Sequence, residues 1–136
     1  MEAIMSTHTS EWIAKRTLYN DQGRAVLDVR LGIPHEVSER EWQCPFQLVE
    51  AGQPDILDAG HGNDAFQALQ LAMEHIRVKL EARGQALHWD SGESGDTGFY
   101  RAIPMFFGLS FARNIEAHID RELESFANAL QAQPPS

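Results

Sequence analysis

The spacing of hydrophobic residues between Gly60 and Gly84 predicts a long helix at the centre of the fold. At about 100° per residue, apolar side chains return to one side of this segment, while a polar stripe occupies the opposite side. Asp64 followed by Gln67 predicts an N-terminal cap, and Gly84 predicts the end of the helix. We expect the apolar side to be buried; its members are Phe66, Leu69, Met73, Ile76 and Leu80, and Ala65 and Ala72 widen it.

Before this helix, apolar and polar residues alternate with the period of β-strands. The alternation predicts strands over residues 11–19, 25–31 and 42–50 and a short fourth strand over 56–59, with residues 35–41 as a charged connector. Pro45 has no amide hydrogen, so its strand is expected at a sheet edge or with a bulge. Consecutive strands joined by short loops predict an antiparallel meander with helices on one face.

After the central helix, residues 90–98 consist only of glycine, serine, threonine and acidic residues, which is typical of a mobile loop. Residues 99–108 are apolar and interrupted by Pro104, so we expect an extended stretch lying across the core. A second helix is predicted over about 111–130, with Ser110 as its cap. Its predicted buried stripe is Phe111, Ile115, Ile119, Leu123, Phe126 and Leu130.

Together these elements predict an α+β fold: an antiparallel meander of three to four strands packed on a long central helix, with a second, C-terminal helix. The length of 136 residues suits one domain, which we place at residues 10–131 with flexible tails at 1–9 and 132–136.

Composition restricts the classes of partner. Twenty acidic and eleven basic residues give a net charge of −9, which repels nucleic acid and anionic lipid. The single cysteine, Cys44, cannot form an internal disulfide, and the N-terminus has no signal-peptide pattern. Because no apolar run approaches the length of a membrane span, we expect a cytoplasmic protein with no nucleic-acid or membrane partner.

One pattern resembles a cofactor site. Gly60 and Gly62, with Ala65, imitate a dinucleotide-binding fingerprint, but Asp64 would face the pyrophosphate and the strands do not form a parallel βαβ unit. We therefore interpret the glycines as a tight strand-to-helix turn. The histidines lack metal-ligand spacing, and Cys44 is interpreted as a small buried hydrophobic residue, so the sequence predicts no catalytic, cofactor-binding or metal-binding residues.

One set of polar residues remains as a candidate ligand site. If the central helix, the sheet and the 90–98 loop enclose a cleft, its polar groups would be His61, Asp64, His88 and Asp90. This set supports an alternative hypothesis, a small-ligand-binding module or small enzyme with the loop as its lid.

Three motifs in order are similar to those of a known family. They are Trp-x-Cys-Pro-Phe at residues 42–46, Gly-x-Asp-Ala-Phe-Gln-Ala-Leu-x-Leu-Ala at 62–72 and Arg-Ala-Ile-Pro at 101–104. The chain resembles, over most of residues 11–126, a family of small bacterial proteins classed as a domain of unknown function. The resemblance implies a bacterial cytoplasmic protein and supports the strand-then-helix layout, and it carries over no catalytic residue.

The leading functional hypothesis is a non-enzymatic protein-interaction domain, and specifically an immunity protein that neutralises a basic toxin. Small size, acidity and the lack of a catalytic set favour this class over an enzyme. Dimerisation through the edge strand that contains Pro45 is a third hypothesis. The acidic residues expected to face a basic partner are Glu39, Glu41, Glu93, Asp96, Glu116, Asp120 and Glu124.

Overall fold

The computed structural model describes residues 12–132 and divides the chain into two compact units, Met1–Arg101 and Ala102–Ser136. The predicted tail at residues 1–9 lies outside the described residues, as does the tail after Ala132.

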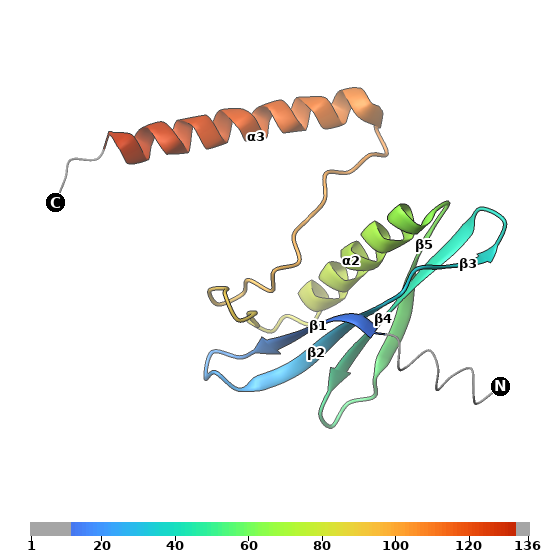
Figure 1. Cartoon of the computed structure of the whole chain (residues 1–136). Helices are drawn as coiled ribbons and strands as arrows, with labels where there is room; N and C mark the ends of the chain where they lie inside the picture. The colour runs from blue at the N-terminus through green and yellow to red at the C-terminus, as the bar shows by residue number, and fades with distance from the viewer. Residues whose placement is uncertain (1–11, 133–136) are drawn as a thin grey trace. The chain divides into compact units, whose positions relative to one another are not determined.

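The first unit is an antiparallel sheet with one helix against it, so the predicted α+β class is confirmed (Figure 1). The sheet has five strands rather than three or four, because the predicted connector at residues 35–41 contains a short strand. The strands pair in the order β1-β2-β4-β3, with β5 also on β4. The elements are β1 (Trp12–Tyr19), β2 (Ala25–Gly32), β3 (His35–Ser38), β4 (Glu41–Glu50), β5 (Ile56–Gly62) and α2 (Ala65–Ala82).

Strand β4 lies inside the sheet, so the prediction that Pro45 marks an edge strand is wrong. On one side β4 pairs with β5 from Trp42 to Leu48. On the other side β4 pairs with β3 from Glu41 to Gln43 and with β2 from Phe46 to Glu50. Pro45 stands where one partner ends and the next begins, which is a place in an interior strand where a missing amide hydrogen is tolerated.

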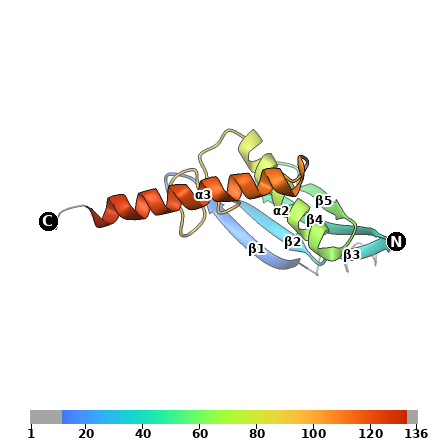
Figure 2. The same cartoon turned by 90° about the horizontal axis from the view of Figure 1, so that it is seen from above.

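Helix α2 packs closely against one face of the sheet, above β5 and β4 (Figure 2). The approach depends on glycine in β5: a Cβ at Gly60 would overlap the backbone of Ala68 and Ala72. At Gly62 a Cβ would lie 2.5 Å from the amide nitrogen of Ala68. Gly60 and Gly62 therefore form the part of β5 on which helix α2 packs. The core consists of Leu18, Leu27, Val29, Cys44, Phe46, Leu48, Ala68, Ala72, Ile76, Leu80 and Leu87.

The buried side of α2 differs from the predicted one. Ala68, Ala72, Ile76 and Leu80 are buried, whereas Phe66 is 78 % exposed and Met73 is also exposed. The prediction is correct for Ala72, Ile76 and Leu80 and wrong for Phe66 and Met73, while Leu69 is partly buried. The reason is the close contact with β5, because only small side chains fit against the glycine-bearing strand and the larger ones turn to the edge of the interface.

The loop that follows α2 is tied to the sheet through Arg16 of β1. The guanidinium carbon of Arg16 lies 4.5 Å from the ring centroid of Trp89 and 4.8 Å from that of Phe99. Its Nη1 donates to the carbonyl of Thr97 at 3.2 Å. At the start of the segment, Tyr19 and His88 exchange two backbone hydrogen bonds. The segment expected to be a mobile loop is thus anchored at several points.

The second unit consists of an irregular segment and α3 (Gly108–Gln131). The helix begins before the predicted position, so Ser110 lies inside its first turn instead of capping it. Within residues 102–132 nothing covers the predicted buried stripe: Leu123 and Phe126 are 64 % and 68 % exposed. The predicted burial of the stripe is therefore not realised inside this unit.

Candidate protein-binding surface

The hydrophobic side of α3 forms a continuous surface that we call the α3 stripe. Its residues recur at intervals of three or four, which keeps them on one side of the helix. A helix of 24 residues is about 36 Å long at 1.5 Å per residue, and the stripe follows most of that length. The stripe comprises Phe111, Ala112, Ile115, Ile119, Leu123, Phe126 and Leu130.

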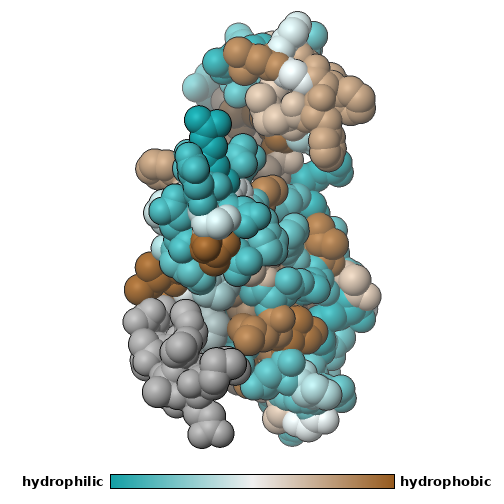
Figure 3. Space-filling model, turned by 90° about the vertical axis from the view of Figure 1, so that its right-hand side faces the viewer, coloured by the Kyte–Doolittle hydropathy of each residue, from teal (hydrophilic) through white to brown (hydrophobic). Residues whose placement is uncertain are grey.

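An aromatic cluster continues the stripe at the start of α3. Phe106 and Phe107 are 90 % and 75 % exposed. The ring of Phe107 meets the ring of Phe111 edge to face, with centroids 5.3 Å apart. Hydrophobic side chains, shown in tan and brown, gather in the upper part of Figure 3. Of the stretch predicted to lie across the core, Phe99 packs against the core. For residues 102–108, which belong to the second unit, it stays a prediction.

Charged residues are distributed unevenly around the stripe. Glu116, Asp120 and Glu124 recur every four residues and line one flank. Glu116 pairs with Arg113 at 2.8 Å. On the other flank Arg121 Nη2 lies 3.4 Å from His118 Nδ1. At about 100° per residue, Glu122 points between Phe111 and Ile115, at the edge of the stripe that lies away from Glu116, Asp120 and Glu124.

The other residues of the predicted acidic surface lie in the first unit and do not form one patch there. Glu39 and Glu41 flank the turn into β4, at the end of the sheet where Trp42 pairs with Gly62. Glu93 and Asp96 belong to the loop joined to the opposite end through Tyr19 and His88. The carboxylate of Asp96 accepts hydrogen bonds from the Gly98 amide at 2.9 Å and the Tyr100 hydroxyl at 3.3 Å, so it helps to build the loop.

The structure does not bring together the four predicted ligand residues. Asp64 caps α2, where its Oδ1 accepts from the Gln67 amide at 2.8 Å, and His61 lies on β5 just before it. His88 and Asp90 follow the other end of the helix. Because α2 has 18 residues, about 27 Å at 1.5 Å per residue, the two pairs lie at opposite ends of the unit.

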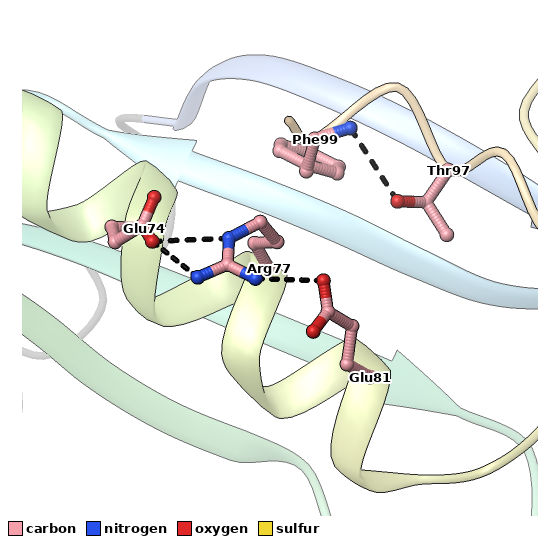
Figure 4. Close-up of polar contacts among 5 residues, drawn as sticks. All are labelled: Glu74, Arg77, Glu81, Thr97 and Phe99. Carbon is pink, nitrogen blue, oxygen red and sulfur yellow. Dashed lines mark hydrogen bonds and ion pairs between the residues drawn. The ribbon is translucent and has the colours of Figure 1, made fainter. Parts of the chain in front are cut away.

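A groove does exist beside α2, but it is lined by other residues. It has a volume of about 530 Å³ and lies between the C-terminal half of α2 and residues 93–101. Arg77 on its wall is held between two carboxylates (Figure 4): its Nη1 donates to Glu81 at 2.7 Å and its Nε to Glu74 at 3.0 Å. These hydrogen bonds, above all the one to Glu74, raise the pKa of Arg77, so the guanidinium keeps its charge. The sequence predicts a cleft between the central helix and the 90–98 loop, but none of the residues predicted to line it, His61, Asp64, His88 and Asp90, lines this groove.

Cys44 is fully buried in the core, and burial raises the pKa of its thiol to about 11. The thiol therefore stays protonated at neutral pH, and a protonated thiol is a poor nucleophile.

In residues 12–132 the structure contains no group of three or more histidine, cysteine, aspartate or glutamate side chains placed to hold a metal ion. Within the same residues, neither helix combines the length and hydrophobicity needed to cross a membrane.

The first unit thus defines an α+β domain in which a five-stranded antiparallel sheet carries one closely packed helix. A family model described as a domain of unknown function (DUF6968) matches residues 14–101, most of the chain, and the protein belongs to this family. The match ends where the first unit ends, so α3 lies outside it. No curated protein and no solved structure matches the chain.

Proposed function

We propose that this protein is a non-enzymatic binding domain for a basic protein partner, and that the partner is a toxin which it neutralises. The observation that supports the proposal is the exposed hydrophobic surface formed by the aromatic cluster and the α3 stripe. Large hydrophobic side chains grouped on a surface are typical of protein-binding sites. Aromatic residues are also frequent among those that contribute most of the binding energy at interfaces.

The charge of the chain favours a basic partner. A net charge of −9 on 136 residues attracts a cationic protein over the distance that salt leaves unscreened, about 8 Å at physiological ionic strength. Association should therefore slow as salt rises, while dissociation depends mainly on the hydrophobic contact. The toxin assignment rests on small size and acidity, both of which suit a protein that covers a cationic active surface.

The test is co-expression of the full chain with the products of neighbouring genes, followed by purification of any complex. Leu123→Asp places a charge on the α3 stripe, and Ala117→Asp places the same charge on the opposite side of α3. We expect one neighbouring product to co-purify with the wild type and Ala117→Asp, and to be lost with Leu123→Asp. If the neighbouring gene product is toxic, cells that express it should survive with the wild type or Ala117→Asp and should not survive with Leu123→Asp. Recovery of no complex with any neighbour would overturn the proposal.

A second candidate function is small-ligand binding, which the groove beside α2 favours. Its volume of about 530 Å³ falls within the range of ligand pockets, roughly 300 to 1,000 Å³. Its mixed lining supplies apolar contact from Leu80 and Phe99 and hydrogen-bonding groups from Gln85, Ser94 and Tyr100. A ligand that binds the native state raises the unfolding temperature. A thermal-shift screen of metabolites should then give a hit that Tyr100→Ala weakens; a screen with no such hit would remove this candidate.

A further inference from the structure

Strand β5 forms one edge of the sheet, and among the described residues of the first unit its outer side has no strand partner. An edge of this kind presents unpaired amide and carbonyl groups, to which a strand of another molecule can add. The β5 edge also carries exposed apolar side chains, since Ile56 is 37 % and Leu57 61 % exposed. Such an edge attracts a second strand unless something blocks it.

Both backbone groups of Ala59, at the middle of β5, are held by side chains of the same unit. The Ala59 amide donates to Oδ1 of Asp58 at 2.8 Å, and Nδ1 of His75 on α2 lies 3.3 Å from the Ala59 carbonyl oxygen. A carbonyl oxygen only accepts, so Nδ1 carries the proton in this contact. Lys79 of α2 holds the carboxylate of Asp58, with Nζ 3.3 Å from Oδ2. The middle of the edge is thus occupied by side chains from the strand and from the helix.

The register of β5 places these contacts on the outer side of the strand. Ala59 lies opposite Pro45, which has no amide hydrogen to donate to the Ala59 carbonyl. Together with the two side-chain contacts, this orients the Ala59 groups away from β4, as in a non-hydrogen-bonded pair of an antiparallel ladder. The pairing of β5 with β4 has no register shift, so the backbone groups of Leu57 and His61 point outward as well. A strand added at this edge would need Ala59, the central one of these three positions.

From this arrangement we infer that Asp58 and His75 block the β5 edge and prevent it from pairing with β5 of a second copy of the chain. An incoming strand would have to break both hydrogen bonds of Ala59 before it formed its own. It would also remove the charged pair of Asp58 and Lys79 from water, which is unfavourable. Charged side chains at sheet edges are a common protection against edge-to-edge association. The inference concerns self-association and does not depend on the proposed partner.

The test compares the double variant Asp58→Ala/His75→Ala, which frees both groups of Ala59, with Lys79→Ala, which removes the ion pair but leaves both hydrogen bonds. In sedimentation velocity of the full chain, we expect the double variant to form larger species than the wild type and Lys79→Ala do at the same concentration. Leu57→Pro removes an outward amide hydrogen from the same edge and, added to the double variant, should abolish this association. A double variant that associates no more than the wild type, or association that Leu57→Pro leaves unchanged, would overturn the inference.

Amide hydrogen exchange gives a second measurement, which needs no variant. After correction for intrinsic rates, the Ala59 amide of the wild type should exchange at least about fivefold more slowly than those of Leu57 and His61, because it alone of the three is hydrogen-bonded. Equal exchange at the three amides would overturn the inference: fast exchange would mean that the block does not form, and slow exchange that another segment already pairs with the edge. In the double variant, association should protect all three amides together, and association without that protection would contradict pairing through β5.

Discussion

Gly60 of β5 lies directly beneath Ala72 of α2, so close that a Cβ added to the glycine would stand 2.6 Å from the Cα of the alanine. The contact is backbone against backbone and leaves no flexible side chain that could move aside. It fixes the distance between helix and sheet, and it determines which side of α2 is buried. The residues that imitate a nucleotide-binding motif in the sequence are therefore explained by packing.

Replacement of Gly60 by alanine should destabilise the protein. The added methyl group would collide with the backbone of Ala68 and Ala72, and overpacking of this kind costs about 1 to 3 kcal/mol or more. Urea denaturation followed by circular dichroism measures the change. Gln70→Ala, on the exposed side of the same helix, is the control and should stay within about 0.5 kcal/mol. A Gly60→Ala variant as stable as this control would mean that α2 does not pack as described.

A second pair of variants tests the buried side of α2. Ile76 is fully buried, so Ile76→Ala should lower the free energy of unfolding by about 2 to 5 kcal/mol. Phe66 is 78 % exposed, so Phe66→Ala should change it by no more than about 0.5 kcal/mol. Denaturation curves of the two variants under the same conditions give the comparison. Similar losses in the free energy of unfolding for both variants would mean that Phe66 is buried, as the sequence predicted.

The sequence predicts α2 well in extent but not in rotation, and the reason is physical. Periodicity weights large apolar residues, so Phe66 and Met73 defined the predicted face. The actual face depends on Ala68 and Ala72, whose advantage is their small size beside Gly60. The small size of these alanines is an advantage only when α2 packs against β5. In the same way β3 escaped prediction because three of its four residues are exposed and no hydrophobic alternation marks it.

The residues of the candidate surface could be predicted from the sequence, but their exposure could not. The stripe and acidic flank of α3 follow from helical periodicity alone, and the structure has the helix where it was expected, beginning a few residues earlier. Whether another element covers a stripe is a tertiary property, so its exposure within the second unit could not be predicted. The grouping of His61 with His88 failed for a similar reason. Strand register sets His61 opposite Gln43 and His88 opposite Tyr19, and register depends on contacts distant in the sequence.

The contact between Arg16 and the loop gives a third prediction. The planar guanidinium is in contact with the rings of Trp89 and Phe99, and lysine cannot reproduce that stacking together with the hydrogen bond to Thr97. A cation–π contact contributes about 0.5 to 2 kcal/mol. Arg16→Lys should therefore accelerate amide hydrogen exchange across residues 89–99 by roughly 2- to 30-fold, with little change in α2. Lys15→Arg, at an exposed neighbouring position, is the control; unchanged exchange in the loop with Arg16→Lys would contradict the anchoring role.

The last prediction concerns pH and Asp58 on β5. Its Oδ1 accepts a hydrogen bond from the Ala59 amide at 2.8 Å, and its Oδ2 lies 3.3 Å from Lys79 Nζ on α2. The backbone hydrogen bond and, after it, Lys79 lower the pKa of the carboxyl below its usual 3.8. A group whose pKa is lower in the folded state contributes stability that is fully present above the unfolded value and is lost as pH falls through the folded value.

Asp58→Asn should therefore be less stable than the wild type at pH 7, and the difference should shrink as the pH is lowered below 3.8. Urea denaturation of both proteins at pH 7 and at pH 3 provides the four free energies that are needed. Asp90→Asn, on the 89–99 loop, removes an equal charge away from Lys79 and corrects for the general effect of acid on this acidic chain. Because the Asp58 side chain is 48 % exposed, its contribution is screened by water and salt. A constant difference between Asp58→Asn and the wild type at both pH values would show that the contact with Lys79 and the Ala59 amide does not favour the charged form.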